Sequence, residues 1–176
     1  DYQLGRIRDF FNGDNGDLDK QRQQIYSVQA IGSGQLNGKG LNNDDPTSML
    51  NAGYIYEPQT DFIFAVIGEE LGFLGGVLCI GILALIVFEC ILEAIRTRDF
   101  EGRLICCGMA ALITFQTFIN IGVATRMLPN TGLPLPFYSY GLSSMVSLFS
   151  AFGIVLNIHL SRYEKKKDNT LRFEYE

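Results

Sequence analysis

Residues 71–88 read LGFLGGVLCIGILALIVF, 18 consecutive positions without an Asp, Glu, Lys or Arg. An α-helix rises about 1.5 Å per residue, so about 20 apolar residues cross a bilayer core of about 30 Å. The apolar character extends back to Phe62 if Glu69 and Glu70 are tolerated inside the run. This stretch therefore predicts a membrane-spanning helix over residues 62–95.

Two more uncharged stretches follow, over residues 104–125 and 127–160. Both are long enough to cross a bilayer, but the second begins with the proline-rich segment LPNTGLPLPF, and proline disrupts a helix interior. Buried helices of a soluble protein are the competing interpretation. Three such runs would need a much larger soluble protein to cover them, so we predict three membrane-spanning helices.

Basic residues near the ends of the spans indicate which side each loop faces, because Lys and Arg are enriched in cytoplasmic loops. The link after the first span and the tail after the third are rich in them, whereas the link between the second and third holds Arg126 alone. We therefore predict an all-α polytopic membrane protein fragment, with three transmembrane helices preceded by a long extracytoplasmic loop. The predicted order is extracytoplasmic loop 1–61 with short amphipathic helices, helix 62–95, cytoplasmic loop 96–103, helix 104–126, extracytoplasmic loop 127–136, helix 137–160 and cytoplasmic tail 161–176.

The overall composition averages two chemically different regions. A mean hydropathy of +0.14 and 19% charged residues would suit an ordinary globular domain of 176 residues, yet nine of the 19 acidic residues lie in the first 61 positions. The net charge of −5 brings no basic stripe, which argues against a nucleic-acid partner. The chain begins at Asp1 without a readable signal peptide, so we expect a piece of a longer protein.

All four cysteines lie inside apolar runs and lack C-x-x-C spacing. We expect buried packing thiols rather than metal ligands or disulfides. They are Cys79, Cys90, Cys106 and Cys107.

The leading loop contains three recognisable segments. Residues 2–11, YQLGRIRDFF, predict a short amphipathic helix along the outer interface, and residues 12–19 have turn composition. Residues 31–41, IGSGQLNGKGL, lack both the spacing of a phosphate loop and the surrounding βαβ unit that nucleotide binding requires. Two interpretations remain: the glycines permit close backbone approach, or bare N–H groups and Lys39 face an anionic head group.

Asp61 immediately precedes the first apolar run, where a helix N-cap is the simplest interpretation. On one continuous helix, Gly68, Gly72 and Gly76 would lie on the same side as Asp61. They would form a G-x-x-x-G pattern that lets neighbouring helices approach closely. Asp61 would then lie at the start of the helix face that is turned into the protein, where a carboxylate can contact a substrate.

Glu69 and Glu70 would lie about 12 Å deeper along the same helix. Charged side chains at that depth are costly, so we expect them to face the interior, a cavity or a partner charge. They are either structural partners of polar or basic groups in other spans or linked to a substrate.

Four stretches, in this order, resemble the SEDS family (shape, elongation, division and sporulation), which includes RodA, FtsW and SpoVE. They are AIGSGQLNGKGL at 30–41, EPQTDFIFAVIGEELGFLG at 57–75, NIG at 120–122 and LPNTGLPLPFYSYGLSS at 128–144. Family members have ten spans, so the resemblance implies the final outer loop and spans eight to ten. Tyr56, Gln35 and Leu142 depart from the family pattern, the last two at positions where glycine is common.

The resemblance implies a glycosyltransferase of the bacterial cell membrane that polymerises lipid II into glycan strands on the outer face, for elongation, division or sporulation. The family's essential aspartate falls on Asp61 through the motif E-x-[HQ]-T-D-F. Our hypothesis makes Asp61 the general base of an inverting transfer, with Lys39 and Arg126 at the leaving pyrophosphate and a divalent cation, Mg or Mn, as an optional helper. Arg126 suits an interface anchor equally well. The candidate substrate-binding residues are Lys39, Glu57, Thr60, Glu69, Arg126 and Ser139, and no residue is predicted to ligate a metal.

The implied partners are lipid II, membrane lipids, a class B penicillin-binding transpeptidase and other proteins of the elongation or division complex. A lipid II flippase is the alternative function, because acidic residues inside the membrane also suit a transport path. The isolated fragment is expected to be inactive. Ser139, Ser143 and Ser144 either pack helices together or line a lipid-tail groove, and His159 is expected to be solvated or interfacial.

Overall fold

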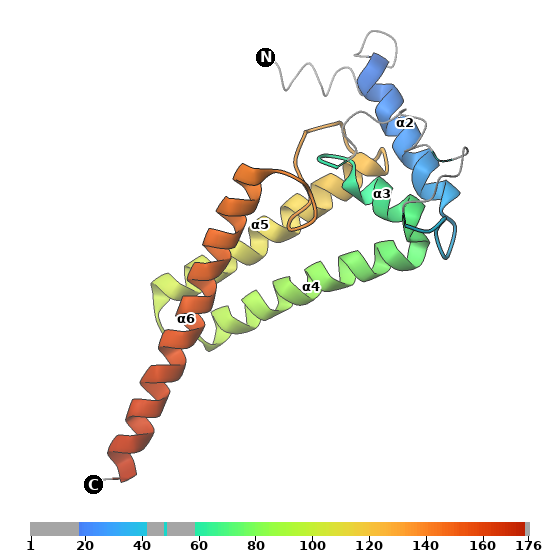
Figure 1. The fold of residues 1–176 in the computed structure, drawn as a ribbon. Helices are drawn as coiled ribbons and strands as arrows, with labels where there is room; N and C mark the ends of the chain where they lie inside the picture. Colours follow the sequence, from blue (N-terminus) through green and yellow to red (C-terminus); the bar gives the residue numbers. More distant parts are fainter. Residues whose placement is uncertain (1–17, 42–47, 49–58, 175–176) are drawn as a thin grey trace, which may run out of the picture.

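The computed structural model describes residues 18–41, 48 and 59–174, and every regular element in these ranges is a helix. This confirms the all-helical class (Figure 1). The helices are α2 (Leu18–Ser33), α3 (Ile63–Glu70), α4 (Gly72–Arg96), α5 (Phe100–Ala124) and α6 (Leu142–Glu174). The amphipathic helix predicted at residues 2–11 and the candidate Glu57 lie outside the described residues.

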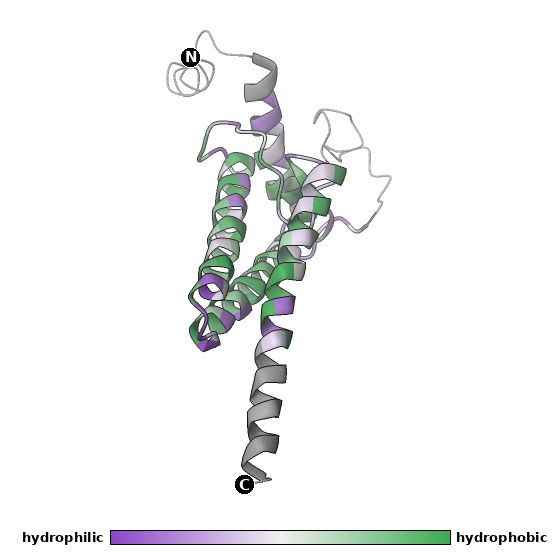
Figure 2. Cartoon of the chain, turned by 90° about the vertical axis from the view of Figure 1, so that its left-hand side faces the viewer, coloured by the Kyte–Doolittle hydropathy of each residue, from purple (hydrophilic) through white to green (hydrophobic). Residues whose placement is uncertain are grey.

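Within the described residues, three helices are long and apolar enough to cross a membrane: α4, α5 and the Leu142–Ser161 part of α6. α4 and α5 form a hairpin, and α6 runs past its turn (Figure 1). At most 28% of each span is buried, so these helices cover little of one another. The coloured ribbons of these helices are largely green in Figure 2, and purple gathers at the turn between α4 and α5. Such helices need lipid or further spans around them.

The helix predicted over residues 62–95 is broken into two. α3 ends at Glu70, and α4 begins at Gly72, whose φ of +67° is a left-handed conformation that glycine adopts at little cost. The two helices meet in a V (Figure 1), and a Cβ on Gly76 of α4 would lie 3.5 Å from the ring of Phe64 in α3. The prediction that Asp61 shares a continuous helical face with Gly72 and Gly76 is therefore wrong.

The glycine-rich segment after α2 closes the start of α4. The carbonyls of Gln35 and Leu36 accept hydrogen bonds from the N–H groups of Phe73 and Leu74, at 2.8 and 3.2 Å. The first N–H groups of a helix have no partner inside the helix, so these bonds stabilise a helix start within the apolar run. Gln35 itself has a φ of 51°, a conformation that suits the glycine common at this position in the resembling family.

The same segment closes the end of α3. The N–H groups of Lys39 and Gly40 donate to the carbonyls of Glu69 and Glu70, at 2.9 and 3.0 Å. A Cβ on Gly38 would lie 2.1 Å from the Glu70 carbonyl oxygen, so only glycine permits this approach. Of the two interpretations of this segment, these contacts support close backbone approach, because the N–H groups of Lys39 and Gly40 are hydrogen-bonded to α3.

α2 is a 16-residue helix in the region predicted as a loop with short amphipathic helices, and it starts inside the predicted turn at 12–19. Its Gln24 side chain donates to the carbonyls of Val123 and Leu128, at 3.3 and 2.9 Å, and its Ser27 hydroxyl donates to Ala124, at 2.8 Å. These acceptors lie at and just beyond the end of α5, where helix carbonyls lack internal partners. Tertiary contacts therefore stabilise α2 against α5.

The other predicted boundaries shift by a few residues. α5 begins at Phe100 instead of residue 104, and α6 begins at Leu142 instead of residue 137. Phe137 has a φ of 65° in the turn that precedes α6, a conformation that does not continue a right-handed helix. The part of α6 that is long and apolar enough to cross a membrane ends at Ser161, close to the predicted end at 160, and the helix itself continues to Glu174.

Three of the four cysteines are buried in the core, and all four are free thiols. Cys79, Cys90 and Cys106 confirm the packing prediction. Cys107 is exposed, which corrects it. Adjacent residues of a helix point about 100° apart, so Cys107 faces away from the contact that buries Cys106.

The turn end of the hairpin is joined to α6. His159 Nδ1 lies 2.9 Å from Glu93 Oε2, and the Glu93 side chain is 9% exposed against 48% for His159. Gly102 allows a close approach there, since its Cβ would lie 3.2 Å from Ile158. His159 is partly solvated as expected, and it also binds α4 to α6.

Candidate functional site

Asp61 lies in a turn at residues 59–62, before α3 begins. Phe62 is the N-cap residue of α3, and no side chain caps the helix, so the prediction that Asp61 is the N-cap is wrong. Three consecutive carbonyls of the turn accept hydrogen bonds from distant residues: Gln59 from Tyr140 N–H at 2.9 Å, Thr60 from Ser139 Oγ at 2.7 Å, and Asp61 from Asn120 Nδ2 at 2.9 Å.

The proline-rich loop is bound by two of the same side chains. Asn120 Nδ2 also donates to the Leu133 carbonyl at 2.8 Å, and the Leu135 N–H donates to Ser139 Oγ at 2.7 Å. Asn120 and Ser139 are 1% and 2% exposed. Both residues thus connect the Asp61 turn to the loop over residues 128–140.

The Asp61 carboxylate lies beside the tip of this loop. A Cβ on Gly132 would be 3.5 Å from Asp61 Oδ2, and Gly132 has a φ of +69°. Asp61 is half-buried, whereas Gly132 is exposed. Within this chain, the carboxylate is therefore partly exposed and lies next to an exposed glycine of the loop.

Three candidate substrate-binding residues near Asp61, which are Thr60, Ser139 and Arg126, differ in exposure and in hydrogen bonding. Thr60 is half-buried and offers its carbonyl to Ser139. Ser139 is buried and holds backbone groups on both sides, so its hydroxyl is a structural contact. Arg126 is exposed six residues beyond Asn120, with a φ of 59° and its N–H bonded to the Val123 carbonyl at 3.1 Å. It therefore lies at the same end of α5 as the Asp61 turn.

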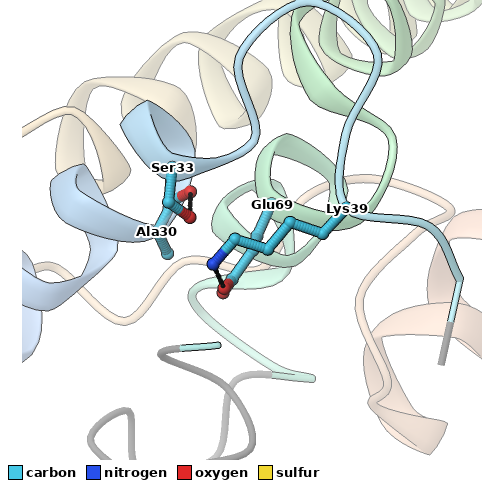
Figure 3. A network of polar contacts seen from close by, with 4 residues as sticks. All are labelled: Ala30, Ser33, Lys39 and Glu69. Atoms are coloured by element: carbon cyan, nitrogen blue, oxygen red, sulfur yellow. Dashed lines mark hydrogen bonds and ion pairs between the residues drawn. The ribbon is translucent and has the colours of Figure 1, made fainter. Parts of the chain in front are cut away.

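Lys39 and Glu69 form an ion pair at the opposite end of α3, with Nζ 2.9 Å from Oε1 (Figure 3). The two side chains are 16% and 1% exposed. Glu69 lies eight positions after Asp61, about 12 Å along the axis if the segment were wholly helical. The expectation of a partner charge for Glu69 is confirmed, and that charge comes from the leading region instead of a missing span.

A cavity of about 330 Å³ lies beneath the proline-rich loop, between α5 and α6. Its lining is mostly apolar, and Ser139 and Ser144 are among the polar exceptions. Tyr138, in the same loop, hydrogen bonds Cys79, and burial is the main cause that raises the pKa of the Tyr138 hydroxyl. The cavity suits an apolar chain better than a sugar or a phosphate.

Among the described residues, no group of three His, Cys, Asp or Glu side chains gathers as a metal site would require. Asn120, in contrast, is a site residue that the sequence interpretation missed. The available signal was an amide within the uncharged run at 104–125, because a polar group inside a membrane helix needs a partner.

Comparison with known proteins gives consistent matches along the chain. A family model described as a cell cycle protein of the FtsW, RodA and SpoVE type matches residues 1–164. The chain is 40% identical over 164 residues to stage V sporulation protein E of Bacillus subtilis (strain 168), covering 93% of this chain and 43% of the relative. It is 35% identical over 162 residues to the peptidoglycan glycosyltransferase MrdB of Escherichia coli (strain K12), covering 92% and 43%.

A solved structure has the same fold over most of the chain. It is described as "Structural coordination of polymerization and crosslinking by a peptidoglycan synthase complex", and it matches with a TM-score of 0.71 and 30% identity. The match covers 92% of this chain and 43% of that one. The chain thus spans less than half the length of these relatives.

Proposed function

This chain belongs to the family of FtsW, RodA and SpoVE, and from that premise we propose that its complete protein is a peptidoglycan glycosyltransferase with Asp61 as general base. Relatives named as peptidoglycan glycosyltransferases support the reaction class. The observation that carries the residue assignment is the placement of Asp61, whose carboxylate lies at the protein's edge on a turn held by three distant residues.

The proposed reaction joins two lipid II molecules. Asp61 accepts the proton of the acceptor's sugar hydroxyl while that oxygen attacks the anomeric carbon of the donor. The bond from this carbon to the pyrophosphate breaks, the lipid pyrophosphate leaves with the electron pair, and the anomeric centre inverts. The half-buried position limits access of competing water to the carboxylate.

The departing pyrophosphate needs positive charge on the other side of the reacting carbon. Arg126 suits this role because it is exposed at the Asp61 end of α5. Lys39, the other candidate, is paired with Glu69, so we assign it to structure. The described residues do not form a Mg or Mn site by themselves, and no step is assigned to a cation.

We place the Asp61 end on the extracytoplasmic side, because the basic links at 96–103 and 161–176 favour the cytoplasm for the opposite ends. A class B penicillin-binding transpeptidase of the elongation or division complex is the proposed partner, consistent with the synthase complex of the matching structure. Transport of lipid II gains no support here, since the Glu69 carboxylate that favoured it is ion-paired with Lys39.

The test is polymerisation of purified lipid II by the complete protein carrying Asp61→Asn. We expect the rate to fall at least about 100-fold, the usual contribution of a general base, while the variant folds normally. Glu101→Gln is the matched control, an acid-to-amide change at an exposed position of α5. Normal glycan chains from a folded Asp61→Asn protein would refute the assignment, and lipid II crossing proteoliposomes without glycan would favour the flippase. Residues 1–176 alone should produce no glycan.

A further inference from the structure

We propose that Asn120 and Ser139 are positioning residues, which set the place of the Asp61 carboxylate by holding the backbone of its turn against α5 and the proline-rich loop. This inference rests on the proposed function, because it concerns the same carboxylate. Neither residue reaches the reacting atoms in this proposal, since both bind backbone groups.

Asn120 contributes through its amide nitrogen. Both groups that it faces, the carbonyls of Asp61 and Leu133, are acceptors, so only the NH₂ orientation of the side chain makes hydrogen bonds. Its Oδ1 is buried and makes no hydrogen bond with the residues described. Burying an unbonded oxygen is unfavourable, so this arrangement stands because of the two donated bonds.

Ser139 repeats the pattern from the other side. Its hydroxyl donates to the Thr60 carbonyl, one peptide before the one that Asn120 holds, and accepts from the Leu135 N–H. Two buried side chains from different elements therefore fix two consecutive peptide groups of the turn and two sites in the loop. The turn and the loop behave as one unit.

The conformation of the Asp61 turn depends on these contacts, because the following helix, α3, stabilises the turn little. α3 starts only at Ile63 and has no side-chain cap. We call Asn120 and Ser139 the clamp residues. Loss of either clamp residue lets the peptide plane of the turn tilt, which moves the carboxylate away from the attacking hydroxyl. A displacement of about 1 Å can cost about 100-fold in rate.

The experiment compares Asn120→Leu and Ser139→Ala with Thr114→Val in the complete protein. Thr114 also lies in α5, but among the described residues its hydroxyl binds only the Ala110 carbonyl of the same helix. We expect kcat for lipid II polymerisation to fall about 10- to 100-fold in the two clamp variants, with KM within about 2-fold of wild type. Thr114→Val should retain wild-type kcat. The double variant should lose less than the product of the two single losses, because the residues hold one unit.

Wild-type kcat in a folded Asn120→Leu or Ser139→Ala protein overturns the inference. So does a loss that tracks thermal stability equally in all three variants, or that appears in KM alone. If Asn120→Leu does not fold, Ser139→Ala decides the matter. The outcomes separate from those of the proposed function, since an inactive Asp61→Asn together with an unimpaired clamp variant refutes only the positioning role.

Discussion

The two ends of α3 each carry a carboxylate, and the protein treats them in opposite ways. Glu69 is 1% exposed and paired with Lys39, and the backbone around it is closed by the glycine-rich segment. Asp61 is half-buried beside exposed Gly132, and the Asn120 side chain donates a hydrogen bond to its peptide carbonyl. One carboxylate therefore contributes to structure, while the surroundings of the other leave it accessible for chemistry.

In our proposal, the burial of each carboxylate and the origin of its contacts account for the different roles of Glu69 and Asp61. An acidic residue inside an apolar run is expensive wherever it lies. At Glu69 the cost is offset by an opposite charge, whereas Asp61 precedes the apolar run and is only half-buried. The following predictions test this contrast.

The largest expected effect on stability is that of Lys39→Met. The change removes the ammonium group that forms an ion pair with buried Glu69, and breaking a buried ion pair costs about 3–5 kcal/mol. Thermal unfolding of the complete protein in detergent measures it, with Arg98→Met as the control at an exposed position. The double variant Lys39→Met/Glu69→Gln should regain most of the loss because the buried charge is gone. No recovery would mean that the pair does not explain this end of α3.

Gly38→Ala should have an intermediate effect at the same end. The added Cβ would meet the Glu70 carbonyl oxygen, and the φ of +75° is unfavourable for alanine. We expect a loss of about 1–3 kcal/mol, the usual range for a strained backbone position.

Two other glycines separate the possible causes of that loss. Gly40→Ala shares the positive φ, at +96°, but finds open space, so it isolates the backbone term. Gly32→Ala has neither problem and should be neutral or slightly stabilising. Equal losses at Gly38 and Gly40 would show that close approach to α3 does not matter.

The sequence predicted the three spans well, because long uncharged runs report directly on the membrane. It did not predict the break at Leu71, since an apolar run looks the same whether it forms one helix or two. The break is stabilised by bonds from Gln35 and Leu36, more than 30 positions earlier in the chain. No local pattern in residues 62–95 carries that information.

The candidate site was predicted in part for the same reason. Asp61 was identified from its motif and its place before an apolar run, but its neighbours depend on tertiary structure. Asn120 lies 59 residues away, and its role follows only from which carbonyls it meets. Lys39 carries a charge that the sequence assigned to the substrate, whereas the fold gives it to Glu69.

The smallest expected effect is that of Ser33→Ala, close to the Lys39 and Glu69 pair in Figure 3. Its hydroxyl donates to the Ala30 carbonyl within α2, at 2.8 Å. Such local bonds to the preceding turn contribute little, so the stability should change by less than about 0.5 kcal/mol in the same unfolding measurement. A loss as large as that of Lys39→Met would mean that this region resists any change, and the contrast between the two ends of α3 could then no longer be attributed to charge.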